Sequence, residues 1–311
     1  MGEQDVRQRS DAEEIRVFLR HLLKDVQAFE RMLEEDRFET GVRRIGAEQE
    51  LFLVDSFWRP APIATEVLEV VDDEHFTTEL ARFNLDPHIF GGTCLRDMEW
   101  QLGELLGKAR AAAQSCGGDA VLTGILPTLK KSDLELINMT PNPRYYALNE
   151  AMNRLKGGAY EFFLQGMDEL HLHHDSILVE AANTSFQVHF QVAPDEFAKL
   201  YNAAQAVAGP LLSAAVNSPM LFGKRLWAET RIGLFQQSID TRRTTPHLRE
   251  QTPRVSFGRH WIKNSALEIF KEDIARFRAL LSTEVDDDPF DELANGRAPS
   301  LKALRLHNST V

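Results

Sequence analysis

Two acids placed two residues apart in a predicted strand constrain this chain more than any other feature. The segment 46–55, GAEQELFLVD, reads as a β-strand, and side chains alternate between the two faces of a strand. Glu48 and Glu50 therefore share one face with Phe52, about 7 Å from each other. Such carboxylates repel each other unless a cation lies between them, and Mg²⁺ selects carboxylate oxygens. The segment predicts either a metal-binding strand or an edge strand with a solvated acidic face.

Composition limits the classes of function. The chain has 311 residues, 43% of them hydrophobic, which suffices for one large domain or two smaller ones. Its formal net charge of −12 argues against a nucleic-acid or anionic-membrane surface, but not against a nucleotide that arrives with Mg²⁺. Cys94 and Cys116 form no CxxC pair, so we predict no disulfide framework or zinc site and a cytoplasmic location. The polar N-terminus and the short apolar runs predict neither a signal peptide nor a membrane span.

Apolar periodicity predicts the secondary structure. Helices are predicted over 10–37, 64–72, 95–115, from about 144, over 194–216 and over 265–281. Strands are predicted over 43–55, 78–85, 120–125 and 177–192, the second of them ending at Asp86-Pro87. A polar loop is predicted from Arg242, and the acids after 284 are predicted to be solvated. Strands and helices mix without a βαβ rhythm, which favours an α+β fold with an antiparallel sheet flanked by helices.

Polar side chains gather on one side of three predicted strands. In addition to Glu48 and Glu50, they are Glu79, Asp86, Gln187, His189 and Gln191. Burying such a face is costly unless ions or ligands satisfy it, so we predict a ligand cavity. His189 is either a metal ligand or a hydrogen-bonded structural residue.

Two other clusters carry weaker signals. The segment 217–231 begins Asn217-Ser218-Pro219 and contains Arg225 and Arg231, which are either clamps for carboxylates and phosphates or surface charges. The run HLHHD at 171–175 has no zincin pattern and is interpreted as a surface or cap segment. The sequence has no P-loop, dinucleotide-binding or serine-hydrolase motif.

Four blocks, in order, resemble the glutamate–cysteine ligase type 2 family of carboxylate–amine ligases. They are 46–54 (GAEQELFLV), 76–85 (FTTELARFNL), 187–189 (QVH) and 217–231 (NSP, then Gly223 and Arg231). The resemblance implies a glutamine-synthetase-like catalytic domain, in which a curved antiparallel sheet forms a funnel for ATP, Mg²⁺ and an amino acid. It also implies activation of glutamate as a γ-acyl phosphate, which an amine such as cysteine then attacks.

The resemblance implies roles for individual residues. Glu48 and Glu50 would hold Mg²⁺, with Glu79 or Asp86 adding a carboxylate and His189 beside the metal and the phosphates. Arg231 would bind the transferring phosphoryl group or a substrate carboxylate. The other candidates for binding substrate or ATP are Gln187, Gln191, Asn217, Arg225 and Arg144. Residues 1–40 would form an N-terminal helical segment, and residues 41–311 the catalytic domain.

Alternatives stay open at this level. Many family members have Glu where this chain has Asp86, and residues 300–311 resemble the start of the family's closing strand, so we expect a domain that is cut short. A non-catalytic relative that binds nucleotide or amino acid, as a sensor or a subunit, is the main rival. A metal-dependent hydrolase of another fold is a third reading. Apolar stripes on the helices 10–37 and 194–216 allow a homo-oligomer, although core packing is their commoner fate.

Overall fold

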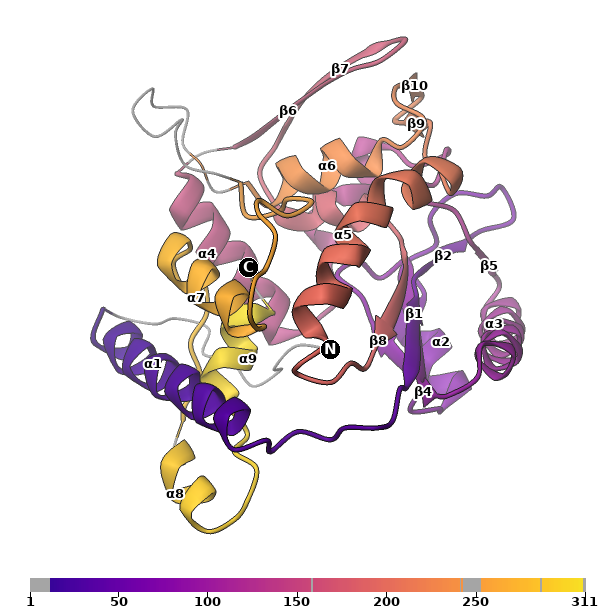
Figure 1. Cartoon of the computed structure of the whole chain (residues 1–311). Coiled ribbons are helices and arrows are strands. Elements are labelled where there is room, and N and C mark those ends of the chain that lie inside the picture. Colours follow the sequence, from indigo (N-terminus) through magenta and orange to yellow (C-terminus); the bar gives the residue numbers. More distant parts are fainter. Residues whose placement is uncertain (1–11, 158, 241, 243–252, 286, 310–311) are drawn as a thin grey trace.

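A six-stranded antiparallel sheet organises the molecule (Figure 1). The computed structural model describes residues 12–157, 159–240, 242, 253–285 and 287–309. The strands of the sheet are β1 (Ile45–Gln49), β2 (Leu51–Val54), β3 (Phe76–Thr78), β4 (Asn84–Gly92), β5 (Asp119–Val121) and β8 (Phe186–Phe190). Their order is β5-β2-β4-β1-β8, and β3 pairs with β4. The predicted α+β class with an antiparallel sheet is confirmed. Within the described residues the sheet is open, so its closure into a funnel is not seen.

The two faces of the sheet belong to two different cores. Helices α2 (Ala64–Val71) and α3 (Leu95–Ser115) cover one face, where Leu51, Leu53 and Leu85 are buried. On the opposite face Phe52 and Val54 join the main core of the protein. This is the alternation predicted for the acid-bearing strand, since Phe52 shares its face with Glu48 and Glu50.

Helices and short hairpins complete the structure. The N-terminal helix α1 (Ala12–Glu34) packs against α7 (Leu267–Arg276), α8 (Pro289–Ala294) and α9 (Lys302–Asn308). The remaining α-helices of the described residues are α4 (Pro143–Lys156), α5 (Phe197–Ala214) and α6 (Arg231–Ser238). Two hairpins lie outside the main sheet. In one, β6 (Tyr160–Gln165) pairs with β7 (Glu169–His174), and in the other, β9 (Met220–Leu221) pairs with β10 (Lys224–Arg225). The 171–175 histidine run lies mostly in β7, where His171 and His173 are exposed and His174 is buried. None of the described helices has the length and apolarity that a membrane crossing requires.

The predicted end of the second strand at Asp86-Pro87 is wrong. The predicted strand over 78–85 comprises the last residue of β3, a turn and the first two residues of β4, and β4 continues through Pro87 to Gly92. Glu48 pairs with His88 and Leu51 with Leu85, and this common register places Pro87 opposite Gln49, where β4 pairs with neither β1 nor β2. The His88 N–H donates to the His75 carbonyl on the β3 side. The nitrogen of Pro87 therefore faces the β1–β2 junction, where no ladder bond is lost.

The single strand predicted over 177–192 is also wrong. Its first part is a buried 3₁₀ helix, Ile177–Ala182, and only Phe186–Phe190 is a strand. The Ser176 hydroxyl accepts from the Leu178 N–H and caps this helix. A short continuous apolar run does not distinguish a buried strand from a buried helix, which explains the error.

The closing strand expected over 300–311 is a helix, α9, in its described part. The carboxylate of Asp25 on α1 accepts a hydrogen bond of 3.0 Å from the Leu304 N–H, in the first turn of α9. This N-terminal cap comes from a residue almost 280 positions away, so no local signal could have indicated it.

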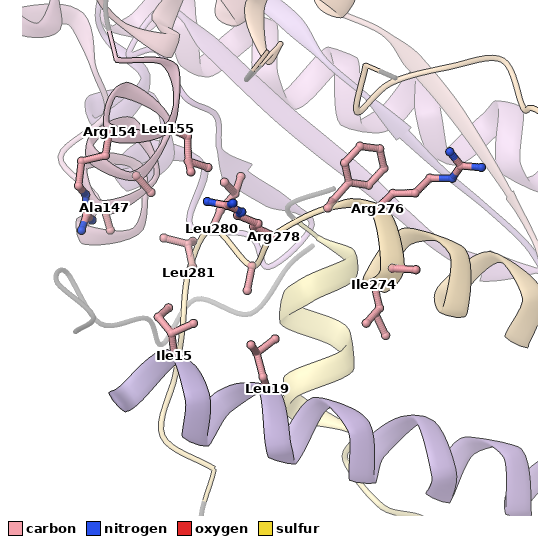
Figure 2. A pocket seen from close by; sticks show the side chains of 14 residues that line it. Ile15, Leu19, Ala147, Arg154, Leu155, Ile274, Arg276, Arg278, Leu280 and Leu281 are labelled. Atoms are coloured by element: carbon pink, nitrogen blue, oxygen red, sulfur yellow. The ribbon is translucent and has the colours of Figure 1, made fainter. Parts of the chain in front are cut away.

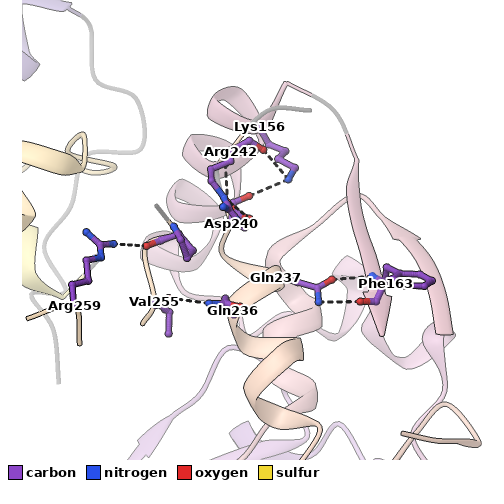
Figure 3. A network of polar contacts seen from close by, with 9 residues as sticks. Lys156, Phe163, Gln236, Gln237, Asp240, Arg242, Val255 and Arg259 are labelled. Atoms are coloured by element: carbon purple, nitrogen blue, oxygen red, sulfur yellow. Dashed lines mark hydrogen bonds and ion pairs between the residues drawn. The ribbon is translucent and has the colours of Figure 1, made fainter. Parts of the chain in front are cut away.

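Side chains of α6 and its C-terminal extension fasten the β6–β7 hairpin and the end of α4 (Figure 3). The Gln237 amide accepts from the Phe163 N–H at 2.9 Å and donates to the Phe163 carbonyl at 3.2 Å. Lys156 donates to the carbonyls of Asp240 and Arg242, and Arg242 is paired with Asp240. Arg242 is thus an ordered start to the predicted polar loop, whose residues 243–252 lie outside the described part.

Candidate active site

The register of the sheet brings the predicted acids to one face of β1, β4 and β8. Glu48 lies opposite His88 on β4 and opposite Gln187 on β8. Residues directly opposite in antiparallel strands project to the same face. Because the register of β4 is common to β1 and β2, Glu50 lies opposite Asp86. Three strands therefore supply one polar surface, as the sequence predicted.

A group of three potential ligands lies within this surface. Ligand atoms of Glu48, Asp86 and His88 lie within 4.8 Å of one another. The Nε2 atom of His88 is 2.8 Å from Asp86 Oδ2, and its Nδ1 atom is 3.4 Å from Glu48 Oε1. Thr77 Oγ1 also lies 2.9 Å from His88 Nε2. The sequence analysis missed His88 because it ended the strand at Pro87, whereas the spacing Asp86-x-His88 along a continuing strand would have placed both on one face.

His88 carries a positive charge in this arrangement. Burial opposes the charged imidazole, but the hydrogen bonds to Asp86 and Glu48 outweigh it and raise the pKa of His88 to about 9. The same hydrogen bond to His88 holds the pKa of Glu48 below its usual value against the effect of burial. A protonated His88 therefore balances these two carboxylates in the metal-free protein.

Further acids extend the group into a carboxylate cluster, defined here as Glu48, Glu50, Glu79, Asp86 and Glu180. Burial, together with the charges of Glu180 and Asp86, raises the pKa of Glu50 to about 8. Burial and the charges of neighbouring acids, Glu50 first, raise the pKa of Glu79 well above its ordinary value, and burial raises the pKa of Glu180 to about 7. Glu180 was missed because it lies in the 3₁₀ helix predicted as a strand, and Glu79 directly follows β3.

The cluster fits a divalent cation. Three of its acids, Glu50, Glu79 and Glu180, have raised pKa values, and Asp86 Oδ1 is buried with no hydrogen-bond partner among the described residues. Leaving a buried carboxylate oxygen unsatisfied is unfavourable, and a cation would satisfy it. Carboxylate oxygens are the donors that Mg²⁺ prefers. The residues that would hold the metal are Glu48, Glu50, Asp86 and their neighbours in the cluster.

The polar residues of β8 divide between two places. The Gln187 amide donates to Glu50 Oε1 at 3.2 Å, and His189 Nε2 lies 3.6 Å from Glu48 Oε1 with its side chain half exposed. Gln191 lies beyond the end of β8, where it bonds Glu39 and Arg44. Gln187 and His189 therefore border the carboxylate cluster, and Gln191 contacts a different ion pair.

Arg231 is held in a polar network beside the cluster. Its guanidinium donates to Glu229 at 2.6 and 2.8 Å and to the Thr184 carbonyl at 2.7 Å. The Ser218 hydroxyl also donates to Glu229. Thr184 precedes Ser185, whose N–H donates to Glu50 Oε2 at 2.7 Å. The Arg231–Glu229 pair thus supports the chain segment that hydrogen-bonds Glu50 of the carboxylate cluster.

Close packing around Gly124 joins Asn217 to the same network. A Cβ atom on Gly124 would lie 2.3 Å from Asn217 Oδ1 and 2.7 Å from Arg231 Nε. The Gly124 carbonyl accepts from the Thr184 N–H at 3.0 Å. Only glycine leaves room for this approach of the backbone to Asn217 and Arg231.

The two other predicted arginines make different contacts. Arg225, on the exposed β10, donates to Asp168 at the β6–β7 turn, with its Nη2 atom 3.0 Å from Asp168 Oδ1. Arg144 is buried near the start of α4 and donates to Ser309 after α9. Neither contact brings these arginines to the carboxylate cluster.

A cavity of about 610 Å³ lies elsewhere, between α1, α4 and α7 (Figure 2). Its walls include the apolar side chains of Ile15, Leu19 and Leu281, with Arg154 and Arg278 among its lining residues. No acid of the carboxylate cluster lines it. The cavity and the cluster are therefore separate features.

Comparison with known proteins identifies the family of the chain. The model of glutamate-cysteine ligase family 2 matches residues 44–262, more than two thirds of the chain. This range contains all five acids of the carboxylate cluster, together with His88, Glu229 and Arg231. Among curated proteins, none matches the chain. On the extent of the family match, the chain belongs to glutamate-cysteine ligase family 2, whose activity is of the carboxylate–amine ligase type.

Proposed function

We propose that this protein is an ATP-dependent ligase that joins the γ-carboxylate of glutamate to the amine of cysteine or a similar compound. The observation that carries the proposal is the carboxylate cluster, which gathers five acids from β1, the β1–β2 junction, β4, a 3₁₀ helix and the loop after β3. Ionisation of these buried, neighbouring acids is unfavourable unless a cation is bound. In a ligase family, that requirement is explained by a nucleotide bound together with Mg²⁺.

The reaction proceeds in two transfers. A γ-carboxylate oxygen of glutamate attacks the γ-phosphorus of ATP, ADP leaves, and a γ-glutamyl phosphate forms. The amine nitrogen then attacks the acyl carbon, phosphate leaves, and the nitrogen loses a proton to give the amide. Mg²⁺, when bound, would neutralise the charge of the phosphates during the first transfer.

The residues of the chain position the reactants. Glu48, Glu50 and Asp86 would hold the cation, and Gln187 fixes the orientation of Glu50 through its hydrogen bond. Since a cation replaces the charge of His88, the imidazolium would release its proton when the site is filled. His189 is open to solvent beside Glu48 and can donate to a phosphate oxygen.

Arg231 is the candidate for contact with the transferred group. A guanidinium has five N–H donors, and the hydrogen bonds to Glu229 and Thr184 in the described structure occupy one on each nitrogen. Two N–H groups therefore stay free for a phosphoryl or carboxylate oxygen. Glu229 holds the guanidinium in one orientation, which reduces the entropy lost on binding.

The proposal also covers features that neither the fold nor the family decides. Asn217 beside Arg231 would bind substrate or nucleotide, and the site would use small molecules, not nucleic acid. The funnel, the division at residue 40 and a cytoplasmic location belong to the same proposal.

An ADP-release assay tests the proposal. Mg·ATP and glutamate are supplied with and without cysteine to the wild type, Glu50→Gln and the control Glu69→Gln, which changes an exposed acid on α2. We expect cysteine-dependent ADP release that Glu50→Gln abolishes and Glu69→Gln retains. Absence of release from the wild type with any amino acid would refute ligase activity.

One observation favours a second candidate, a non-catalytic relative that binds nucleotide or amino acid. The arginine proposed for phosphoryl transfer already has a carboxylate partner, Glu229. Mg·ATP binding measured by calorimetry, without any turnover in the assay above, would favour this alternative.

A further inference from the structure

The β6–β7 hairpin lies apart from the main sheet (Figure 1). Both of its strands alternate strictly between buried and exposed residues. The buried residues join the main core of the protein, and they include Tyr160, Phe162, Leu164, Leu170 and Leu172. The exposed residues, defined here as the hairpin face, are Glu161, Phe163, Gln165, Glu169, His171 and His173. The ionisable groups of the hairpin face are acids and histidines, without lysine or arginine, which is the composition of a site for a cation.

The register of the hairpin brings both histidines next to one acid. Glu161 lies directly opposite His173, and Phe163 lies opposite His171. Glu161 is therefore also the diagonal neighbour of His171, which a long side chain can reach. The Nδ1 atom of His173 is 3.7 Å from Glu161 Oε1, and the centroids of the two imidazole rings are 4.9 Å apart. Three potential metal ligands thus converge on one side of two paired strands.

These separations are close to those of ligands on a single tetrahedral ion. Bonds of about 2.0–2.2 Å from zinc to nitrogen or oxygen place two ligand atoms about 3.4 Å apart, and the centroids of two imidazoles about 5 Å apart. The observed distances of 3.7 and 4.9 Å differ little from these values. The side chains of His173 and Glu161 are 57% and 56% exposed, so there is room for the small rotations that would close the site.

We propose that Glu161, His171 and His173 bind a divalent transition-metal ion of the zinc type. Two imidazoles and one carboxylate are a known ligand set of zinc, whereas Mg²⁺ prefers oxygen ligands. Three protein ligands leave a fourth position for water or for a group of a bound molecule. The site uses no cysteine, so it is compatible with the lack of a CxxC pair. It contains no residue of the carboxylate cluster and does not rest on the proposed ligase reaction.

The surroundings of the hairpin hold the three ligands in place. The Gln237 side chain on α6 bonds both the N–H and the carbonyl of Phe163, between the strand positions that carry the ligands. The ring of Phe163 also contacts that of His171 edge-on, with centroids 6.2 Å apart. At the turn of the hairpin, Asp168 pairs with Arg225. Ligands on such a fixed pair of strands lose little entropy when an ion binds.

Calorimetric titration with Zn²⁺, in excess Mg²⁺, tests the site. The proteins are the wild type, His171→Ala, His173→Ala and the control His260→Ala, which removes an exposed histidine beside an acid outside the hairpin. We expect a zinc site with a micromolar dissociation constant in the wild type and the control. Either hairpin variant should weaken it more than about 10-fold, with unchanged circular dichroism because both residues are exposed. No zinc binding by the wild type at about 100 μM, or equal binding by wild type and both hairpin variants, would overturn the proposal, whatever the result of the ADP-release assay.

Replacement of one ligand by cysteine gives an independent positive readout. Because a thiolate also binds zinc, His173→Cys should keep the site, in a background with Cys94→Ser and Cys116→Ser. With Co²⁺ as the probe, this variant should show a thiolate-to-cobalt charge-transfer absorption that a further His171→Ala substitution weakens. His260→Cys in the same background is the control and should lack the absorption. If His173→Cys gave no such absorption, or if His171→Ala left it unchanged, the two side chains would not share an ion and the proposal would be wrong.

Discussion

Replacing Glu229 by glutamine tests how strongly the polar network beside the cluster holds the fold. The Glu229 side chain is 5% exposed and that of Arg231 is 19% exposed. Glu229→Gln keeps the shape of the side chain but leaves the guanidinium without its counter-charge. Removing one member of a buried ion pair costs about 3–5 kcal/mol. Because Arg231 retains some solvent access and its bond to Thr184, we expect the lower end, about 3 kcal/mol.

Urea denaturation at neutral pH measures this loss directly. A loss of about 3 kcal/mol lowers the folding equilibrium constant by more than 100-fold and the melting temperature by about 5 °C for a chain of this size. Asp168→Asn is the matched control, since it removes a carboxylate partner from the exposed Arg225, and surface pairs contribute little. A Glu229→Gln loss no larger than that of the control would refute the view of Glu229–Arg231 as a buried structural pair.

The stability difference between wild type and Glu229→Gln should depend on pH, because the pKa of Glu229 changes on folding. Burial opposes ionisation of Glu229, but hydrogen bonds from Arg231 and Ser218 prevail and lower its pKa from the ordinary value of 4.5. A lowered acid pKa contributes stability that is complete above 4.5 and is lost as the pH falls through the folded-state pKa. The difference between wild type and Glu229→Gln should therefore shrink below pH 4.5. A difference that grows on acidification would contradict the assignment.

Three other outcomes are expected. Because the pKa values of His88 and Glu50 are raised to about 9 and 8, both groups carry a proton at pH 7 and Mg²⁺ binding should release about two protons, measured by calorimetry in buffers of different ionisation enthalpy; no buffer dependence would contradict it. The raised pKa of Glu50 means that stability without metal falls as pH rises from 4.5 to about 8, so Glu50→Gln should raise the metal-free melting temperature at pH 8 while it abolishes Mg²⁺ binding. Gly124→Ala should cost about 1–3 kcal/mol through its clash with Asn217, whereas Gly107→Ala, in open space on α3, should stabilise by about 0.5–1 kcal/mol in the same melts.

Much of the fold could be predicted from periodicity alone. The helices α2 and α3 begin and end within one residue of their predicted limits, because an apolar stripe and a glycine after the last turn are local signals. The alternation in 48–53 correctly separated the acid face from the face covered by α2 and α3, because the period of two is fixed by the backbone.

The family, too, was recognisable from short blocks, and the match over 44–262 confirms it. These blocks identify residue types that a nucleotide-dependent reaction needs, such as paired acids and arginines. They do not say which of the arginines approach the acids. Arg225 bonds a carboxylate on a hairpin and Arg231 one beside the cluster, although both lie in the same block.

Tertiary structure decided the composition of the site. His88 and Glu180 entered the carboxylate cluster only because β4 continues past Pro87 and because an apolar run folds as a 3₁₀ helix. A central strand usually excludes proline because a ladder hydrogen bond is lost. Pro87 is accommodated in β4 because its nitrogen faces the junction between β1 and β2, where β4 pairs with neither strand.

Helix α9 also could not be predicted from local sequence signals. The first turn of α9 is capped by the carboxylate of Asp25 on α1, which accepts a hydrogen bond from the Leu304 N–H. This contact exists only in the folded protein. The sequence determined the elements whose signals are local and the chemical character of the polar face. Which acids converge on that face, and with which charges, depended on pairings between distant segments, because their pKa values arise from burial and neighbours that only the assembled sheet supplies.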